Sequence, residues 1–304
     1  MNPPAIDLRI GTMVKADTED LHGYVHALIE HGFESIQPFF GRTLAGVDLP
    51  RLAATLHEAI GASGMRISAL GLYGNPLGAD ELDRQSLAGL EALIDHAHLF
   101  GTDTIAAFTG RVRNQPLEAS LPRFREIWDA LARRAADKGI RIAFENCPMH
   151  GGWQRGDWNI AHNPAAWELM FNELPADNLG LEWEPAHQRY YLLDPMAQLA
   201  RWTPKIFHVH GKDAQVNWEV IHRHGIHGRE PFAFHRFPGC GDSDWRQIIE
   251  ALWLNGYRGT IDIEGWHDPV YCDALEMSGQ VAALRHLEHC RGSYVPNPTR
   301  SVNS

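Results

Sequence analysis

The chain has 304 residues, of which 44% are hydrophobic and 21% are charged, and its 38 acidic and 27 basic side chains give a net charge of −11. This apolar share is enough for a sizeable core, and no apolar run approaches the ~20 residues needed to span a membrane. An acidic balance also disfavours a phosphate backbone as partner, because such binding depends on clustered Lys and Arg. We therefore expect a soluble protein with neither a membrane nor a nucleic-acid partner.

The first residues of the chain and its cysteines indicate the cellular compartment in which we expect the protein. Residues 1–8 lack the basic flank and the apolar stretch of a secretory signal peptide. The four cysteines are widely separated and form no paired motif, which favours reduced thiols over a disulfide framework. They are Cys147, Cys240, Cys272 and Cys290. A cytoplasmic location is the resulting expectation.

Eight apolar runs recur along the chain, and each is followed by a segment with helical periodicity. The runs begin near Asp7, Phe33, Arg66, Thr104, Arg141, Leu179, Lys205 and Thr260. Strands that alternate with helices predict an α/β fold with a parallel sheet, and eight such units predict a closed (β/α)8 TIM barrel. Eight units need roughly 250 residues, so we assign residues 1–291 to one barrel domain. Residues 292–304 form a C-terminal tail, either mobile or packed on a neighbouring copy in a homo-oligomer.

Signals of helices and of helix ends support the predicted barrel. Between the fourth and fifth runs, five apolar residues recur at the spacing of a single buried stripe: Leu121, Phe124, Ile127, Leu131 and Ala135. Glycines mark the return to the next strand, where a helix commonly ends in a left-handed residue. They are Gly32, Gly64, Gly101, Gly139 and Gly256.

The later runs end in side chains that bind metals. Strand ends converge at the C-terminal mouth of a parallel barrel, so residues far apart in sequence become neighbours there. One such charge is explained by a salt bridge, but four on adjacent strands indicate a cation among them, because unpaired charges are costly to desolvate. The predicted ligands are Glu145, Glu184, His210 and Glu264. Three carboxylates and one imidazole are a mostly hard set that suits one Mn²⁺ or Mg²⁺ ion, with Co²⁺ or Zn²⁺ as alternatives.

A second layer follows from the alternation of side chains along a strand. If the ligands face inward, the residues two positions earlier also face inward, one layer deeper. Glu182, His208 and Asp262 occupy those positions. We expect them to orient the metal ligands, as outer carboxylates and imidazoles commonly do.

The ordered set of motifs resembles the sugar phosphate isomerase/epimerase family of xylose-isomerase-like barrels. The motifs are Phe-Glu-Asn at 144–146, Glu-Pro-Ala-His at 184–187, His-Val-His-Gly-Lys-Asp at 208–213, Pro-Gly-Cys-Gly-Asp-Ser-Asp-Trp at 238–245 and Ile-Glu-Gly-Trp at 263–266. The resemblance covers essentially the whole chain. It implies the same four metal ligands and a substrate-contacting role for His187. Two positions depart from the family: Glu184 replaces the usual Asp, and Val216 stands where ketohexose 3-epimerases have Arg.

This site predicts an enzyme that acts on a sugar ketone through an enediolate, because a metal stabilises the oxyanion that forms when the neighbouring C–H loses its proton. Glu145 and Glu264 are the candidate base and acid. Return of the proton to the opposite face is epimerisation, and return to the adjacent carbon is isomerisation. Expulsion of a β-substituent instead makes the enzyme a lyase or dehydratase. The residues do not choose among these outcomes.

Loops after the strands supply the predicted substrate contacts. The segment 150–158 is either a lid that stacks a tryptophan on the sugar or an ordinary surface loop, and the insertion 214–239 is mainly surface or lid. The candidate substrate-binding residues are His187, His150, Trp153, Lys212, Asp213, His235 and Trp266. Because Val216 replaces the expected Arg, we favour a larger or modified sugar, such as a keto-glycoside or keto-inositol, over a free ketohexose.

Two other classes of protein fit the sequence less well. Endonuclease IV-like nucleases of the same fold need extra histidines at the early strand ends, yet the third and fourth runs end at 69–73 and 107–110 with none. A sugar-binding subunit without turnover would not require both Glu145 and Glu264. We therefore predict a metal-dependent isomerase or epimerase.

Overall fold

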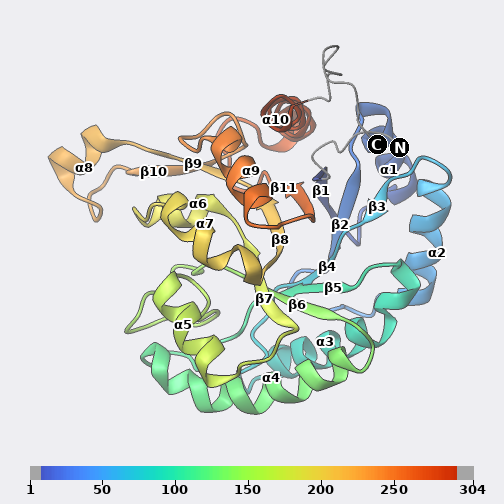
Figure 1. Cartoon of the computed structure of the whole chain (residues 1–304), viewed down its shortest axis with the longest axis horizontal. Coiled ribbons are helices and arrows are strands. Elements are labelled where there is room, and N and C mark those ends of the chain that lie inside the picture. Colours follow the sequence, from blue (N-terminus) through green and yellow to red (C-terminus); the bar gives the residue numbers. More distant parts are fainter. Residues whose placement is uncertain (1–7, 293–304) are drawn as a thin grey trace, which may run out of the picture.

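Eight parallel strands close into a barrel in the computed structural model of the chain, which describes residues 8–292 (Figure 1). The third strand is broken into two short pieces. The barrel strands are β1 (Arg9–Lys15), β2 (Ser35–Phe39), β3 (Arg66–Ile67) with β4 (Leu70–Leu72), β5 (Thr104–Ala107), β6 (Arg141–Glu145), β7 (Leu179–Trp183), β8 (Ile206–Gly211) and β11 (Thr260–Ile263). Each strand pairs with the next, and β11 pairs with β1 to close the ring. The predicted TIM barrel is confirmed, while the predicted tail lies outside the described residues except for Gly292.

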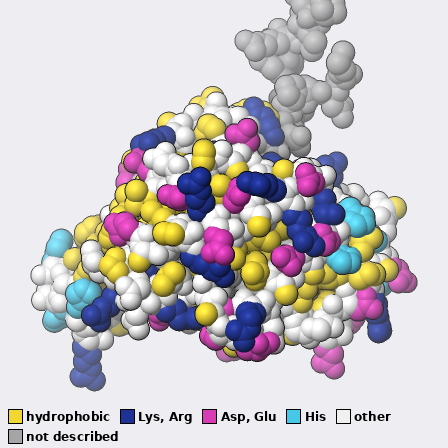
Figure 2. Space-filling model, turned by 90° about the horizontal axis from the view of Figure 1, so that it is seen from below, with side chains coloured by type: hydrophobic (Ala, Val, Ile, Leu, Met, Phe, Trp, Pro, Cys, Tyr) yellow, Lys and Arg dark blue, Asp and Glu magenta, His cyan; other side chains and the backbone are white. Residues whose placement is uncertain are grey.

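Helices surround the barrel (Figure 1). They are α1 (Leu21–His31), α2 (Leu49–Ile60), α3 (Glu81–Phe100), α4 (Leu121–Ala136), α5 (Pro164–Glu173), α6 (Pro185–Tyr190), α7 (Met196–Trp202), α9 (Trp245–Leu254) and α10 (Glu276–Arg291). Short 3₁₀ turns occupy Leu117–Ser120, Thr203–Lys205 and Asp273–Leu275. Among the described residues, no helix is both long and apolar enough to cross a membrane. Figure 2 shows charged side chains of both signs interspersed over one face of the molecule.

The helix α4 buries the stripe that its sequence predicts. Phe124, Leu131 and Ala135 are buried in the core together with Trp128. The Trp128 ring meets Phe144 of β6 edge to face, with ring centres 4.6 Å apart. Its indole N–H donates to the Thr109 carbonyl at 2.7 Å, so the polar atom of this buried ring is satisfied. This packing fixes β6, which carries one of the predicted ligands.

The five glycines predicted to end helices or precede strands all have φ between 69° and 94°. A side chain with a Cβ atom rarely adopts this left-handed backbone, which explains glycine at these positions.

A polar clasp ties the end of the last helix to the first strands. The Arg291 guanidinium donates to the Leu8 carbonyl at 2.6 Å and to both Glu34 oxygens at 2.5 and 3.1 Å. Glu34 Oε2 also accepts the Ile10 backbone N–H at 2.8 Å. The clasp therefore lies beside the seam at which β1 and β11 close the barrel.

The insertion after β8 forms an arm that extends away from the barrel, at the left of Figure 1. Its two antiparallel strands are β9 (Asp213–Val216) and β10 (Ala233–Arg236), and the helix between them is α8 (Trp218–His224). The sequence predicted that residues 214–239 are mainly surface or lid, without predicting their secondary structure. The base of the arm packs against α6, which brings β10 next to the barrel mouth.

Candidate active site

The four predicted ligands lie at the C-terminal mouth of the barrel, as the order of the strands requires. Glu145 is the last residue of β6, Glu184 follows β7, His210 is near the end of β8, and Glu264 follows β11. Each of the four is at most 5% exposed. Burial of three carboxylates and an imidazole in one half of the mouth is costly unless each is compensated.

Three of these side chains gather closely. Ligand atoms of Glu145, His210 and Glu264 lie within 4.8 Å of one another. Glu184 is not part of this group, and its Oε1 instead lies 2.7 Å from His187 Nε2. The Glu184 side chain is longer than that of the Asp usual in the resembled family. Its carboxylate contacts the imidazole of His187 and lies outside the group formed by Glu145, His210 and Glu264.

Several buried polar atoms at the mouth accept or donate no well-directed hydrogen bond within the described part of the chain. They are both Glu184 oxygens, Oε2 of Glu264 and Nδ1 of His210. His210 Nδ1 lies 3.1 Å from Glu264 Oε2, a short distance with poor direction. Such atoms normally have partners, so their meeting in one place fits a cation-binding site.

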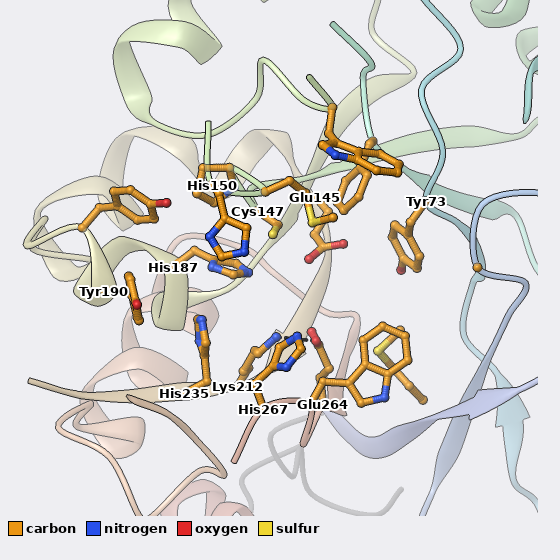
Figure 3. Close-up of a pocket in the computed structure, with 18 of the residues that line it drawn as sticks. Tyr73, Glu145, Cys147, His150, His187, Tyr190, Lys212, His235, Glu264 and His267 are labelled. Atoms are coloured by element: carbon orange, nitrogen blue, oxygen red, sulfur yellow. Dashed lines mark hydrogen bonds and ion pairs between the residues drawn. The ribbon is translucent and has the colours of Figure 1, made fainter. Parts of the chain in front are cut away.

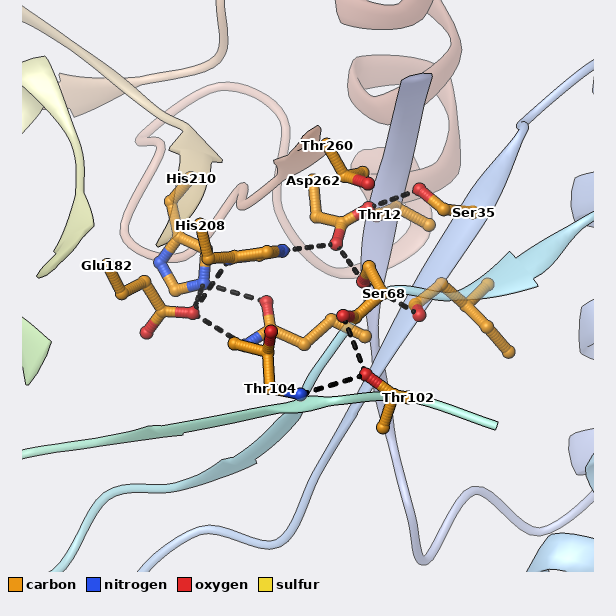
Figure 4. A network of polar contacts seen from close by, with 12 residues as sticks. Thr12, Ser35, Ser68, Thr102, Thr104, Glu182, His208, His210, Thr260 and Asp262 are labelled. Carbon is orange, nitrogen blue, oxygen red and sulfur yellow. Dashed lines mark hydrogen bonds and ion pairs between the residues drawn. The ribbon is translucent and has the colours of Figure 1, made fainter. Parts of the chain in front are cut away.

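The layer below is polar, as the alternation of side chains predicted (Figure 4). Its three members are at most 2% exposed: Glu182, His208 and Asp262. His208 Nε2 lies 2.8 Å from Asp262 Oδ2, and its Nδ1 lies 2.9 Å from Glu182 Oε1. Asp262 also accepts from the Ser35 hydroxyl at 2.7 Å and from the Ser68 hydroxyl. The imidazole of His208 thus bridges two buried carboxylates.

Glu182 connects this layer to the predicted ligands. Its Oε1 lies 3.0 Å from His210 Nε2, whose other close neighbour is the Gln37 amide oxygen at 2.8 Å. One nitrogen of the His210 ring therefore faces the lower layer and the other faces Glu264. This is the arrangement in which an outer carboxylate orients an imidazole ligand.

Two members of this network come from early strands and were not predicted. Gln37 lies on β2 and donates to Glu182 at 2.7 Å, and the Tyr73 hydroxyl after β4 donates to Glu182 at 2.9 Å. Burial and the nearby Glu182 raise the pKa of Tyr73 well above its usual value, so the phenol remains a donor. A glutamine inside the apolar run Ser35–Phe39 was the available signal.

A cavity of about 400 Å³ opens above the gathered carboxylates (Figure 3). Glu145 and Glu264 line it, together with five of the predicted substrate-binding residues: His150, His187, Lys212, His235 and Trp266. Apolar and aromatic side chains line the rest, among them Met13, Tyr73, Phe108, Trp158 and Tyr190. A cavity with apolar walls and a few converging polar groups is typical of small-molecule sites.

Two predicted substrate contacts lie elsewhere. The Trp153 indole N–H donates to Glu118 at 2.7 Å, and its ring packs on the core, so Trp158 of the same loop lines the cavity instead. Asp213 turns away from the cavity and accepts from Ala214 N at 2.8 Å and from the Trp245 indole at 3.2 Å. Its carboxylate therefore attaches the arm to the start of α9.

Backbone strain is concentrated in the loop after β6. Met149 and His150 are consecutive non-glycine residues with φ of 47° and 60°, and both line the cavity. Such conformations cost free energy and cluster at ligand sites.

The pKa values of the two cavity carboxylates are shifted in opposite directions. Burial would raise the pKa of Glu264, but the Lys212 ammonium, with which it forms an ion pair, and His210 together lower it well below its usual value. Burial raises the pKa of Glu145 well above its usual value, and the charge of Glu264 raises it further. Carboxylates with opposed pKa shifts suit a site where one gains and the other gives a proton.

The sulfur of Cys147 also lies in the cavity wall and was not assigned a role from the sequence. Burial raises the pKa of this thiol well above its usual value, with a further contribution from Glu145.

Comparison with known proteins gives similarity over most of the chain. Residues 25–290 match the model of the family described as xylose isomerase-like TIM barrel. The rhizopine catabolism protein MocC of Rhizobium meliloti is 27% identical over 259 residues, which cover 78% of this chain and 74% of that protein. Inosose dehydratase of Lactiplantibacillus plantarum is 30% identical over 158 residues, or 51% of this chain and 49% of the relative.

Solved structures share the fold. The 3-keto-D-glucoside 4-epimerase YcjR of E. coli superposes with a TM-score of 0.68 at 18% identity, covering 93% of this chain and 100% of that chain. Relatives and structural neighbours include both epimerases and dehydratases.

Proposed function

The chain belongs to the family of xylose isomerase-like TIM barrels, and from this premise we propose that it is a divalent-metal-dependent enzyme that moves a proton next to the carbonyl of a keto sugar or a related cyclic polyhydroxy ketone. The observation that carries the proposal is the meeting of Glu145, His210 and Glu264, whose ligand atoms lie within 4.8 Å of one another and of which Glu145 and Glu264 line the cavity. The epimerases and dehydratases among the relatives and neighbours support this range of reactions.

The side chains at the mouth fit a divalent cation. The buried oxygens of Glu184 and Glu264 that accept no hydrogen bond are stabilised if a positive group lies among them. We propose Glu145, Glu184, His210 and Glu264 as its ligands, a mostly oxygen set that favours Mn²⁺ or Mg²⁺. When bound, the cation would polarise the substrate carbonyl and stabilise negative charge on its oxygen.

The two cavity carboxylates are the proposed proton carriers. One removes the proton from the carbon beside the carbonyl, which leaves an enediolate, and the other returns a proton. Return to the opposite face inverts that carbon, and return to the former carbonyl carbon moves the ketone. Glu145, at the end of β6, and Glu264, just after β11, come from opposite sides of β8, which carries His210, and both line the cavity.

Dehydration is the second candidate, supported by the inosose dehydratase relative. In that reaction, the enediolate expels the hydroxyl on the next carbon, which leaves as water after taking a proton. Lys212 is 3% exposed, contacts Glu264 and lines the cavity, so it is placed to donate a hydrogen bond to a departing oxygen.

The walls of the cavity support a ring-shaped ketone larger than a free ketohexose. Trp158, Phe108 and Met13 offer an apolar wall for a ring face or an apolar substituent. The histidines of the wall offer partners for hydroxyls. A keto-inositol or a keto-glycoside presents both kinds of surface.

Hydrogen exchange tests this function. We expect the metal-loaded protein to exchange deuterium from solvent into at least one member of a panel of keto-inositols, keto-glycosides and ketohexoses, observed by NMR. Glu264→Gln should slow exchange at least ~10²-fold, because the amide cannot accept the proton. The matched control is Glu219→Gln, on the exposed face of α8.

The products separate the candidates. Exchange with an inverted or shifted ketone identifies an epimerase or isomerase, and exchange with loss of water identifies a dehydratase. Absence of exchange on every ketone by a metal-loaded protein would contradict the proposal.

A further inference from the structure

A second group of ligand-type side chains lies in the cavity and shares only Glu145 with the set above. Its other members are Cys147, in the loop after β6, and His187, in α6. One carboxylate oxygen, the sulfur and one imidazole nitrogen lie within 4.8 Å of one another. All three residues are at most 8% exposed and line the cavity (Figure 3).

The chemistry of this group differs from that of the oxygen set. A thiolate, an imidazole and a carboxylate are ligands of Zn²⁺, at about 2.3 Å for sulfur and about 2.0–2.2 Å for nitrogen and oxygen. Ligand atoms of a tetrahedral site with such bonds are about 3.5 Å apart. The ligand atoms lie within 4.8 Å of one another, so zinc binding would require these side chains to draw closer together.

The surroundings hold two of these side chains in place. Oε1 of Glu184 lies 2.7 Å from His187 Nε2, so the imidazole is oriented before any cation arrives. The backbone carbonyls of Glu145 and Cys147 both accept from the Asn159 amide at 2.7 Å. Asn159 is 1% exposed, and it fixes the turn that presents the sulfur beside the carboxylate.

We propose that Glu145, Cys147 and His187 form a thiolate-containing zinc site that competes with the proposed catalytic cation for Glu145. The Glu145 carboxylate serves one cation or the other. Hard cations such as Mn²⁺ and Mg²⁺ favour the oxygen set, whereas Zn²⁺ gains from sulfur. Zinc bound there would also occupy the cavity and exclude the substrate.

This zinc site rests on side chains of the cavity alone and does not depend on which ketone the enzyme handles. Binding of the metal is therefore measured without substrate. The test uses the full chain, freed of metal by a chelator, and Co²⁺ as a spectroscopic substitute for Zn²⁺. Coordination of a thiolate to Co²⁺ gives a charge-transfer absorption in the near ultraviolet that oxygen and nitrogen ligands do not give.

We expect this absorption in the wild type and its loss in Cys147→Ser. The matched control is Cys290→Ser, which removes another buried thiol, at 9% exposure, on α10 away from the cavity. Zinc affinity, measured by competition with a chromophoric chelator, should fall at least ~10-fold in Cys147→Ser, whereas Mn²⁺ affinity should stay within about twofold, because manganese does not use the sulfur.

A second variant on a separate element, His187→Gln, should also lower the affinity for zinc. This variant decides the question if circular dichroism shows that Cys147→Ser does not fold. The proposal is overturned if the wild type shows no thiolate absorption or if Cys147→Ser keeps it. It is also overturned if Cys147→Ser lowers the affinities for zinc and for Mn²⁺ by the same factor. Failure of ketone exchange with an intact thiolate absorption would reject the proposed reaction and leave the zinc site standing.

Discussion

Replacement of Asp262 by alanine tests whether the polar layer beneath the candidate site stabilises the barrel. The carboxylate is fully buried and accepts from Ser35 at 2.7 Å, from Ser68 and from His208 at 2.8 Å. Asp262→Ala therefore leaves the Ser35 hydroxyl and the His208 imidazole without this acceptor, whereas the Ser68 hydroxyl keeps the Ile36 carbonyl at 3.0 Å. Ser35 and His208 are at most 2% exposed, so solvent does not readily replace the lost acceptor for these two groups (Figure 4).

The size of the effect follows from these contacts. Removing one partner of a buried ion pair costs about 3–5 kcal/mol, and an unsatisfied buried hydroxyl adds about 1 kcal/mol or more. We expect Asp262→Ala to lower the free energy of unfolding by about 4 kcal/mol. Asp262→Asn keeps one acceptor oxygen and should lose about half as much.

Part of this loss depends on pH. Burial would lower the pKa of His208, but its hydrogen bonds to Asp262 and Glu182 raise it above the usual value. A raised pKa in the folded state stabilises the protein fully below the unfolded pKa of ~6.5, and this stability is lost as pH rises through the folded value. The difference between wild type and Asp262→Ala should therefore be larger at pH 6 than at pH 9.

Equilibrium unfolding in urea, in the presence of a chelator and at both pH values, measures these differences. Asp17→Ala, in an exposed position after β1, is the control and should change stability by less than about 0.5 kcal/mol. An Asp262→Ala protein as stable as the wild type would refute the reasoning, since the buried network would then contribute nothing net.

Three further predictions concern the site and its support. His210→Ala should abolish binding of the divalent ion, measured by elemental analysis, while circular dichroism shows a folded barrel, because the other proposed ligands lie on separate strands. Gly265→Ala should lower the free energy of unfolding by about 2–3 kcal/mol, since a Cβ would lie 1.9 Å from the buried Phe237 ring. Asp83→Asn should cost about 2 kcal/mol at pH 7, because Asp83 is fully buried and accepts two hydrogen bonds of 2.6 Å from Arg113.

Controls for these variants come from the same chain. Burial opposes ionisation of Asp83, but the hydrogen bonds from Arg113 lower the pKa of Asp83 overall. The ionised carboxylate therefore stabilises the fold above pH ~4, and this stabilisation disappears as pH falls through the lowered pKa. A loss in Asp83→Asn that persisted at acid pH would contradict this cause. Gly152→Ala should be neutral, because no atom lies within 4 Å of the added Cβ. Normal metal content in His210→Ala would exclude this imidazole as a ligand.

The sequence predicted the barrel and the convergence of strand ends because a parallel barrel turns the order of strands into adjacency in space. Glu145, His210 and Glu264 meet for that reason. A glutamine in the apolar run of β2 marks Gln37 as unusual, but the partner that Gln37 shares with Tyr73 could not be predicted, since Glu182 lies more than a hundred residues away and only closure of the ring brings them together. The choice between Trp153 and Trp158 depends on the path of an irregular loop, which periodicity does not encode.

Closure of the ring at the seam of β1 and β11 has a consequence for synthesis on the ribosome. β1 can pair with β2 early, but its other edge has no partner until residues 260–263 emerge, and the Arg291 clasp is completed later still. At about 5–20 residues per second, the nascent chain carries an open strand edge for roughly 12–50 s. Unpaired edges invite pairing with other chains, so the first strands depend during this interval on their helices, or on a chaperone, for protection.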